Sequence, residues 1–297
     1  MRRAALACLL LLAACASPAA RAPARSAPPP FTPAPAASVA PRTGPLAKLT
    51  PHVFVIVMEN KSYAEALAQP FTARLAAENA VATNYHAVSH PSLPNYLALT
   101  SGSTYGIRDD GYHVLPGTSI GSQLSAAGIS WRAYMEGMSA NCLAANSVYA
   151  IKHDPFAYYG GACPTNVVPM DQQLDADLAA PAAQAPNFSW ITPDLCHDGH
   201  DCSAPVADGF LAGLVGRILA APAFKSGGVL FVTWDEDDGG ADNRVPLIAV
   251  GAGVHTGSTS DQASDHYSLL ATIEDLLGVS RLGAAASAQP LADLIAR

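Results

Sequence analysis

Two continuous apolar runs constrain the fold of this chain more than any other feature of its sequence. Residues 52–58 and 229–234 are almost entirely apolar, a pattern typical of strands that are buried on both faces. Glu59 follows the first run directly, and Asp235 and Glu236 follow the second. Because functional side chains gather at the carboxyl ends of parallel strands, we expect these carboxylates to meet at one edge of the sheet.

The segments between the strands have helical character. Apolar residues recur about every four positions in residues 62–79 and 206–220, the spacing of one helix face. Strands that alternate with helices predict an α/β fold, in which helices cover both faces of a mostly parallel sheet. Weaker strand candidates are residues 129–135, 188–192 and 247–250, and a last helix is expected over residues 266–277.

The first fifteen residues have the composition of an export signal. A short basic start, Met1–Arg3, precedes an apolar stretch of eleven residues, Ala4–Ala14, which is too short to cross a bilayer as a helix. Leu12-Ala13-Ala14-Cys15 resembles the box at which bacterial lipoproteins are acylated on cysteine. The alternative is an ordinary secretory signal cleaved after a small residue. Both interpretations predict a protein exported to the cell envelope or secreted.

Residues 16–48 are rich in Ala, Pro, Ser and Arg, a composition that predicts an extended, disordered linker. Residues 49–297 are then expected to form a single domain. Six of the 16 Lys and Arg lie before residue 50, whereas all 24 Asp and Glu lie after it, so that the rest of the chain carries a formal charge of −14. Such an acidic domain is a poor candidate for binding nucleic acid.

Four cysteines remain in the expected domain, an even number that fits two disulfides in an oxidising compartment. Pairing Cys142 with Cys163 and Cys196 with Cys202 is preferred because each pair closes a local loop. The alternative is a zinc site, since Cys196 to Cys202 also contains His197 and His200. Structural zinc sites usually draw ligands from two separated segments, which favours the disulfides.

The carboxylates after the two apolar runs suggest a site for a divalent cation. Close, unpaired carboxylates repel one another, and a hard cation with oxygen ligands removes this repulsion. The structural alternatives are a solvated acidic turn closed by Gly239 and a helix N-cap region near Asn60.

Ser92 is the candidate nucleophile. Pro94 suits the first turn of a helix, so Ser92 is expected near the positive N-terminus of that helix, where orphan amides would meet a phosphate. The sequence alone leaves a helix cap as an equal alternative. Among the histidines, His153 and His200 are the preferred candidates for a role in the site.

Six short stretches of the sequence resemble the bacterial phosphoesterase family of secreted acid phosphatases and related phospholipase C enzymes, within the alkaline phosphatase superfamily. They occur in the same order as in that family. The resemblance spans about residues 50–280. The matching stretches are residues 55–63 (VIVMENKSY), 90–96 (HPSLPNY), 152–156 (KHDPF), 197–201 (HDGHD), 233–239 (TWDEDDG) and 265–270 (DHYSLL).

The resemblance implies an alkaline-phosphatase-like fold and assigns roles to individual residues. Ser92 stands at the position of the nucleophile. His153 and His200 correspond to histidines that bind the phosphoryl group or act as acid and base. Substrate contacts are also implied for Asn60 and His266. One divalent ion, which can be Ca²⁺, Mg²⁺, Mn²⁺ or Zn²⁺, would be held by Glu59, Asn60, Ser92, Asp235 and Glu236.

The expected function is a metal-dependent phosphatase that hydrolyses small phosphate monoesters, including phosphoinositides or other phosphorylated metabolites, through a phosphoserine. A monomer is expected, with a membrane link only through Cys15. One alternative is a phospholipase C-type phosphodiesterase. Another is a serine esterase, because residues 117–121 match G-x-S-x-G around Ser119, and Asp235 and His266 follow in the required order. The third is a non-catalytic binding lipoprotein.

Overall fold

The computed structural model describes residues 52–295, which centre on an eight-stranded sheet of order β5-β4-β6-β1-β7-β8-β2-β9. Strands β1 (Val53–Met58) and β7 (Val229–Trp234) lie side by side in its middle and run parallel. Every residue of both strands is buried, which confirms the prediction from the two apolar runs. On the other side of β1, β6 (Phe188–Thr192) and then β4 (Trp131–Met135) continue the parallel arrangement.

The far side of the sheet contains both strand directions. β8 is antiparallel to β7 and to β2, whereas β9 is parallel to β2. At the opposite edge of the sheet, β5 is parallel to β4. The sheet is therefore mostly parallel, as the sequence predicts. The remaining strands are β2 (Ala80–Ala82), β5 (Val167–Pro169), β8 (Leu247–Gly251) and β9 (Thr259–Ser260), and β3 (Tyr85–His86) pairs with β10 (Ser264–Asp265) in a separate two-stranded sheet.

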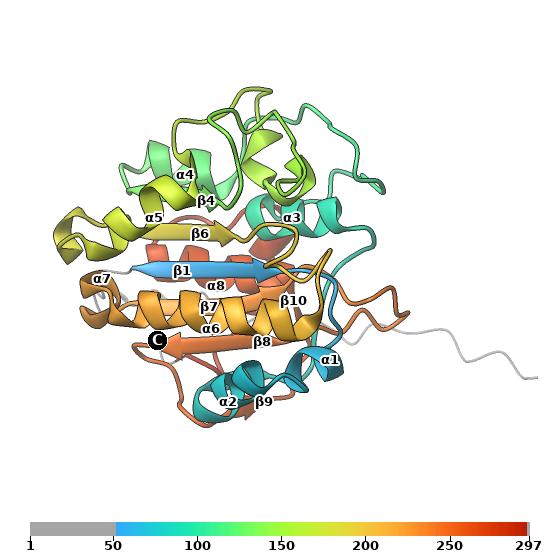
Figure 1. The fold of residues 1–297 in the computed structure, drawn as a ribbon, viewed down its shortest axis with the longest axis vertical. Helices are drawn as coiled ribbons and strands as arrows, with labels where there is room; N and C mark the ends of the chain where they lie inside the picture. Colours follow the sequence, from blue (N-terminus) through green and yellow to red (C-terminus); the bar gives the residue numbers. More distant parts are fainter. Residues whose placement is uncertain (1–51, 296–297) are drawn as a thin grey trace, which may run out of the picture. The chain divides into compact units, whose positions relative to one another are not determined.

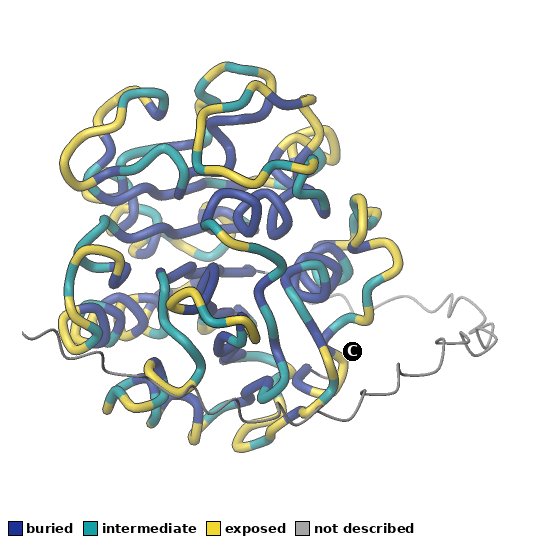
Figure 2. Tube along the Cα trace, turned by 90° about the vertical axis from the view of Figure 1, so that its right-hand side faces the viewer, coloured by how far each residue is buried: buried dark blue, intermediate teal, exposed yellow. Residues whose placement is uncertain are grey.

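Helices cover both faces of the sheet, with α6 in front of it and α8 behind it in Figure 1. The buried residues lie along the central strands, and the exposed ones lie mainly on the outer loops (Figure 2). The helices are α1 (Tyr63–Leu67), α2 (Pro70–Glu78), α3 (Ser92–Ser101), α4 (Ile120–Ala126), α5 (Met170–Ala179), α6 (Ala204–Ala220), α7 (Pro222–Lys225) and α8 (His266–Leu277), and short 3₁₀ turns span Ile151–His153 (η1), Pro155–Ala157 (η2), Ala182–Gln184 (η3) and Gly283–Ala286 (η4).

The helix expected over residues 62–79 is divided into α1 and α2. Pro70 has no backbone N–H and cannot continue a helix, but it suits the first position of a new one, and α2 begins there. Ser62 caps α1 and forms a capping box with Glu65.

Both preferred disulfides are present: Cys142 pairs with Cys163, and Cys196 pairs with Cys202. The zinc alternative is wrong, because the sulfur atoms of Cys196 and Cys202 are bonded to each other and are not free to act as thiolate ligands.

The proposed signal at residues 1–15 and the proposed linker at residues 16–48 lie outside the described residues. The described residues all belong to one compact unit. None of the helices found between residues 52 and 295 combines the length and the hydrophobicity that a membrane crossing needs.

Candidate active site

The ends of β1 and β7 bring the predicted carboxylates together. Met58 and Trp234 are register partners at the last position of the two strands, so Glu59 and Asp235 follow side by side. Both side chains are fully buried. Asn60 follows Glu59 with a φ of 41°. Its backbone N–H donates to Asp235 Oδ1 at 3.2 Å. This turn joins the two strand ends into one site.

Ser92 is the first residue of α3, and Pro91 is the N-cap. Its hydroxyl group lies 3.1 Å from Glu236 Oε1 and 3.4 Å from Glu59 Oε2, and donates toward these carboxylates. Ser92 is therefore not the helix cap that the structural alternative assumed.

The N-terminus of α3 is less available to a phosphate than the sequence suggested. The Leu93 amide already donates to Asp110 Oδ1 at 3.1 Å, and Pro94 has no amide hydrogen to offer. Residues 93 and 94 at this helix start therefore offer no free amide to an anion.

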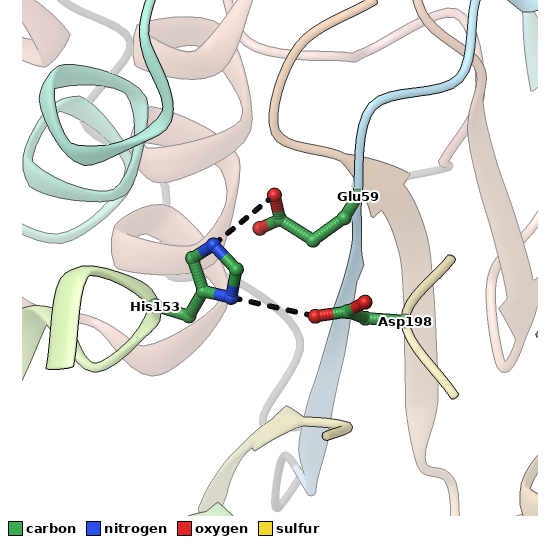
Figure 3. A group of neighbouring side chains, drawn as sticks. All are labelled: Glu59, His153 and Asp198. Atoms are coloured by element: carbon green, nitrogen blue, oxygen red, sulfur yellow. Dashed lines mark ion pairs between the residues drawn. The ribbon is translucent and has the colours of Figure 1, made fainter. Parts of the chain in front are cut away.

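His153 lies between two buried carboxylates (Figure 3). Its Nε2 atom is 3.2 Å from Glu59 Oε2, and its Nδ1 atom is 3.3 Å from Asp198 Oδ2. One ligand atom from each of the three residues lies within 4.8 Å of the others. His153 is 2% exposed, so it occupies the buried side of the site and does not have the open position expected of a residue that contacts the substrate directly.

Asp198 belongs to this cluster, although sequence reasoning did not assign it a role. It follows β6, which neighbours β1, inside the loop closed by the Cys196–Cys202 disulfide. Its carbonyl oxygen accepts from the Glu59 amide at 2.9 Å. An acidic residue just after a strand next to β1 was the available signal, but the sequence does not reveal which strands are neighbours.

Burial makes the acidic side chains of the site hard to ionise without a cation. Burial, followed by the charges of Asp235 and Asp198, raises the pKa of Glu59 well above its usual value. Burial, with the neighbouring charge of Glu236, raises the pKa of Asp235 to about 8. Burial and then the charge of Lys152 lower the pKa of His153. The raised pKa values mean that the ionised carboxylates are disfavoured by burial and by one another, so a cation among them would favour their ionised forms. The lowered pKa of His153 favours its neutral form, in which a ring nitrogen can bind a metal ion.

Three buried atoms of the site lack a hydrogen-bond partner among residues 52–295: Asp235 Oδ2, Asp198 Oδ2 and His153 Nε2. The two carboxylate–imidazole contacts have ion-pair distances without hydrogen-bond geometry. Orphaned buried polar atoms are costly, and a metal ion would satisfy them. A donor set of carboxylate oxygens with one imidazole fits a divalent cation.

Glu236 anchors the opposite side of the site. Its Oε1 atom accepts from Ser92 and, at 3.1 Å, from Asn60 Nδ2, while its Oε2 atom pairs with His90. The sequence analysis did not single out His90. Its partial burial alone would lower its pKa, but hydrogen bonds to Glu236 and Gly240 outweigh this effect and raise the pKa.

An open pocket of about 660 Å³ adjoins these residues. His200 lines it. The Nδ1 atom of His200 lies 2.7 Å from Asp201 Oδ1, and its Nε2 atom lies 3.3 Å from Lys152 Nζ. The pocket is lined by Asn60, Lys61, His90, Pro91, His200, Glu236, Asp237, Asp238 and Gly239.

His266 has a different place from the one expected for a substrate contact. It is fully buried, and its ring nitrogens lie 2.6 Å from the Asp235 carbonyl oxygen and 2.7 Å from the Tyr85 hydroxyl. It therefore supports the backbone behind Asp235. Ser119 is the N-cap of α4 and shares a capping box with Ser122. The serine esterase alternative does not fit this arrangement, because among the described residues His266 contacts neither the Ser119 hydroxyl nor the Asp235 carboxylate.

The fold places the protein in a known structural class. The structure is similar to that of an alkaline phosphatase superfamily protein from Vibrio parahaemolyticus, with a TM-score of 0.57 and 12% identity, over 77% of this chain and 66% of the other. It is also similar to murine ectonucleotide pyrophosphatase/phosphodiesterase 5 in complex with AMP, with a TM-score of 0.58 and 12% identity, over 82% and 100% of the two chains. The chain therefore shares its fold with these proteins.

Within that class, the Phosphoesterase family model matches residues 65–280, and the chain belongs to this family. It is 34% identical to a phosphatidylinositol-3-phosphatase of Mycobacterium tuberculosis, over 82% of each chain. It is 30% identical to a probable acid phosphatase of Kluyveromyces lactis, over 77% of this chain and 59% of the relative. These relatives support a phosphoric monoester hydrolase.

Proposed function

We propose that the protein is a divalent-metal-dependent phosphatase that hydrolyses phosphate monoesters through a phosphoserine at Ser92. The observation that carries this proposal is the position of the Ser92 hydroxyl between Glu59 and Glu236, in a site where three buried atoms have no hydrogen-bond partner among residues 52–295. Family membership and the phosphatase relatives support the reaction class. By similarity to the mycobacterial relative, phosphoinositides belong to the candidate substrates.

The chain offers its donors for one ion at the ends of β1 and β7. When bound, a divalent ion would supply Lewis acidity, which favours the ionised hydroxyl and neutralises phosphoryl charge. Ca²⁺, Mg²⁺, Mn²⁺ and Zn²⁺ all remain candidates, because oxygen donors favour the first three and an imidazole donor suits zinc. The proposed ligands are Glu59, Asn60, Ser92, Asp235 and Glu236, with Asp198 and His153 as further donors from the adjoining cluster.

The chemistry of the chain's own residues follows from these contacts. Ser92 Oγ attacks phosphorus as its proton passes toward Glu236 Oε1, the acceptor that lies 3.1 Å away. The bond from phosphorus to the leaving oxygen breaks, and His200 in the pocket wall donates a proton to that oxygen. Water then attacks the phosphoserine and gives a proton to His200 while the bond from phosphorus to Ser92 Oγ breaks. Glu236 returns its proton to Ser92 Oγ, so that inorganic phosphate and free Ser92 are formed.

The test is phosphate release from a panel of monoesters and diesters, with and without EDTA, by the wild type and Ser92→Ala. We expect monoester hydrolysis that EDTA abolishes and that Ser92→Ala lowers by several orders of magnitude. A preference for diesters would favour the phospholipase C-type alternative. Retained binding without turnover in the wild type would favour a binding lipoprotein.

We also propose that the protein is an exported monomer, anchored to the membrane by a lipid on Cys15. The two disulfides support an oxidising compartment. Fractionation of cells that express the wild type or Cys15→Ala tests the anchor. The wild type should sediment with membranes, and the variant should not. Size-exclusion chromatography of the released domain tests the monomer.

A further inference from the structure

Lys61 is held in a fixed place at the site. It follows Asn60 and lies just before the Ser62 cap of α1. Its ammonium group donates to the carbonyl oxygens of Asn60 and Gly199, both at 3.0 Å. Because one of these carbonyls follows β1 and the other belongs to the Cys196–Cys202 loop, the Lys61 side chain crosses between two walls of the site.

The charge of Lys61 is not neutralised by a carboxylate. Within residues 52–295, no carboxylate oxygen lies within ion-pair distance of Lys61 Nζ, whereas Lys152 Nζ pairs with Asp110 Oδ2 at 3.0 Å. An ammonium group has three N–H donors. The two carbonyl contacts use two of them, which leaves one donor and a whole positive charge for a ligand.

Lys61 lines the same pocket as Asn60, His200 and Glu236. Glu236 is the residue that accepts from the Ser92 hydroxyl. The half-buried ammonium therefore borders the space in which a phosphoryl group would approach Ser92. Asp237 and Asp238 line the same pocket, so an anion that binds there needs cationic groups such as the Lys61 ammonium to offset their charge.

We propose that Lys61 is a substrate-binding residue that contacts a non-bridging phosphoryl oxygen and favours monoester dianions over diester monoanions. The proposal rests on the proposed function. A phosphate monoester carries a charge of about −1.5 to −2 near neutral pH because its second pKa is about 6, whereas a diester carries a single charge. An uncompensated cation therefore attracts the monoester more strongly. It also reaches a third terminal oxygen that a diester does not have.

The test compares Lys61→Met and Lys61→Arg with the wild type, and Lys225→Met serves as a control at an exposed lysine of α7. Kinetics use 4-nitrophenyl phosphate and bis(4-nitrophenyl) phosphate. Calorimetry measures binding of inorganic phosphate and dimethyl phosphate to each protein loaded with its divalent ion.

We expect Lys61→Met to lower monoester kcat/KM and phosphate affinity by roughly 10- to 100-fold, the range for a charged hydrogen bond. Values for diester and dimethyl phosphate should change by less than about 3-fold, and Lys61→Arg should recover most of the loss.

Two results would overturn the proposal. Equal losses for monoester and diester, together with weaker divalent-ion binding, would mean that Lys61 only ties Gly199 to Asn60. Unchanged phosphate affinity in Lys61→Met would place the ammonium outside the anion's binding position. If the wild type hydrolyses neither ester with any divalent ion, the proposed function fails, and the calorimetric comparison of the two phosphates still decides the role of Lys61.

Discussion

The Ser92 hydroxyl and the Glu236 carboxylate lie 3.1 Å apart, although they are separated by 144 positions in the chain. Glu236 reaches Ser92 from the end of β7, and Ser92 begins α3. The same Glu236 oxygen also accepts from Asn60, so one carboxylate orients the serine and the turn after β1. The Glu236 side chain is long enough to complete both contacts.

Glu236→Gln tests the importance of this charge. The amide keeps nearly the same shape and an oxygen for Ser92, but it removes the negative charge needed to hold a cation and to take the serine proton. We expect monoester kcat to fall by about 100-fold or more, within the range of general acid–base contributions, and divalent-ion affinity to fall in calorimetry. Asp242→Asn is the matched control because Asp242 is exposed. Equal activities of Glu236→Gln and the control would rule out the proposed role.

Removal of the divalent ion should lower stability as well as activity. The buried carboxylates of Asp235 and Asp198 each have an oxygen without a partner, so a bound ion should stabilise the folded state. At an ion concentration of 100 times Kd, linkage gives about 2.7 kcal/mol. EDTA should therefore lower Tm measurably by calorimetry.

The Asp235→Asn variant distinguishes the loss of stabilisation by the bound ion from a general loss of stability. The pKa of Asp235 is raised to about 8 by burial and by the charge of Glu236, so a neutral amide should be tolerated in the ion-free protein. We expect the variant to lose the increase in Tm on addition of the divalent ion while its ion-free Tm stays equal to or above that of the wild type. An unchanged ion-dependent increase would contradict the role of Asp235 as a ligand.

The Cys196–Cys202 disulfide should matter more for ion binding than the Cys142–Cys163 disulfide. Asp198 lies two residues from Cys196 in a tight loop, whereas His153 lies about ten residues from either end of the longer one. Paired Cys→Ser variants of each disulfide, titrated with the divalent ion, test this difference. We expect roughly 10-fold weaker affinity without Cys196–Cys202, the lower range for losing a group that orients a ligand.

Loss of Cys142–Cys163 should mainly lower the free energy of unfolding, by about 3 kcal/mol for a loop of this length, with affinity changed by less than about 3-fold. Urea unfolding of the two double variants measures this decrease in the free energy of unfolding. Weaker ion binding in both variants to the same extent would show that the tight loop has no special role.

Glu274 should make stability fall as the pH rises. It is buried on α8, and burial raises its pKa to about 8 although it accepts from the Leu282 amide. The folded state therefore binds the proton more tightly than the unfolded chain. The protonated form stabilises the fold fully below the unfolded pKa, and this contribution is lost as the pH rises through about 8.

Glu274→Gln cannot lose this proton, so its free energy of unfolding should fall less than that of the wild type between about pH 5 and pH 8.5. Urea unfolding at both pH values measures the difference, with Glu78→Gln as a control at an exposed position of α2. Parallel changes in all three proteins would argue against the raised pKa.

The sequence alone was sufficient for the local features of this protein. Continuous apolar runs specified β1 and β7, because strands buried on both faces have no polar side. Period-four spacing predicted α6. The same spacing predicted one helix over residues 62–79, which Pro70 divides into α1 and α2 because proline cannot continue a helix. The local loops of four cysteines pointed to the observed disulfides. Residues just past strand ends pointed to Glu59, Asp235 and Glu236, because parallel strands end at the same edge.

Only the tertiary structure decided which neighbours those residues have. The order of the strands places β6 beside β1, and this order brings Asp198 to Glu59 although nothing in the spacing of the two residues indicates it. The fold also places His266 behind Asp235 and directs the Ser92 hydroxyl toward Glu236. Within the described part of the chain, it leaves the Lys61 ammonium without a carboxylate partner. These are contacts between distant segments, and they depend on how the strands and loops pack. Local sequence patterns describe only neighbours along the chain.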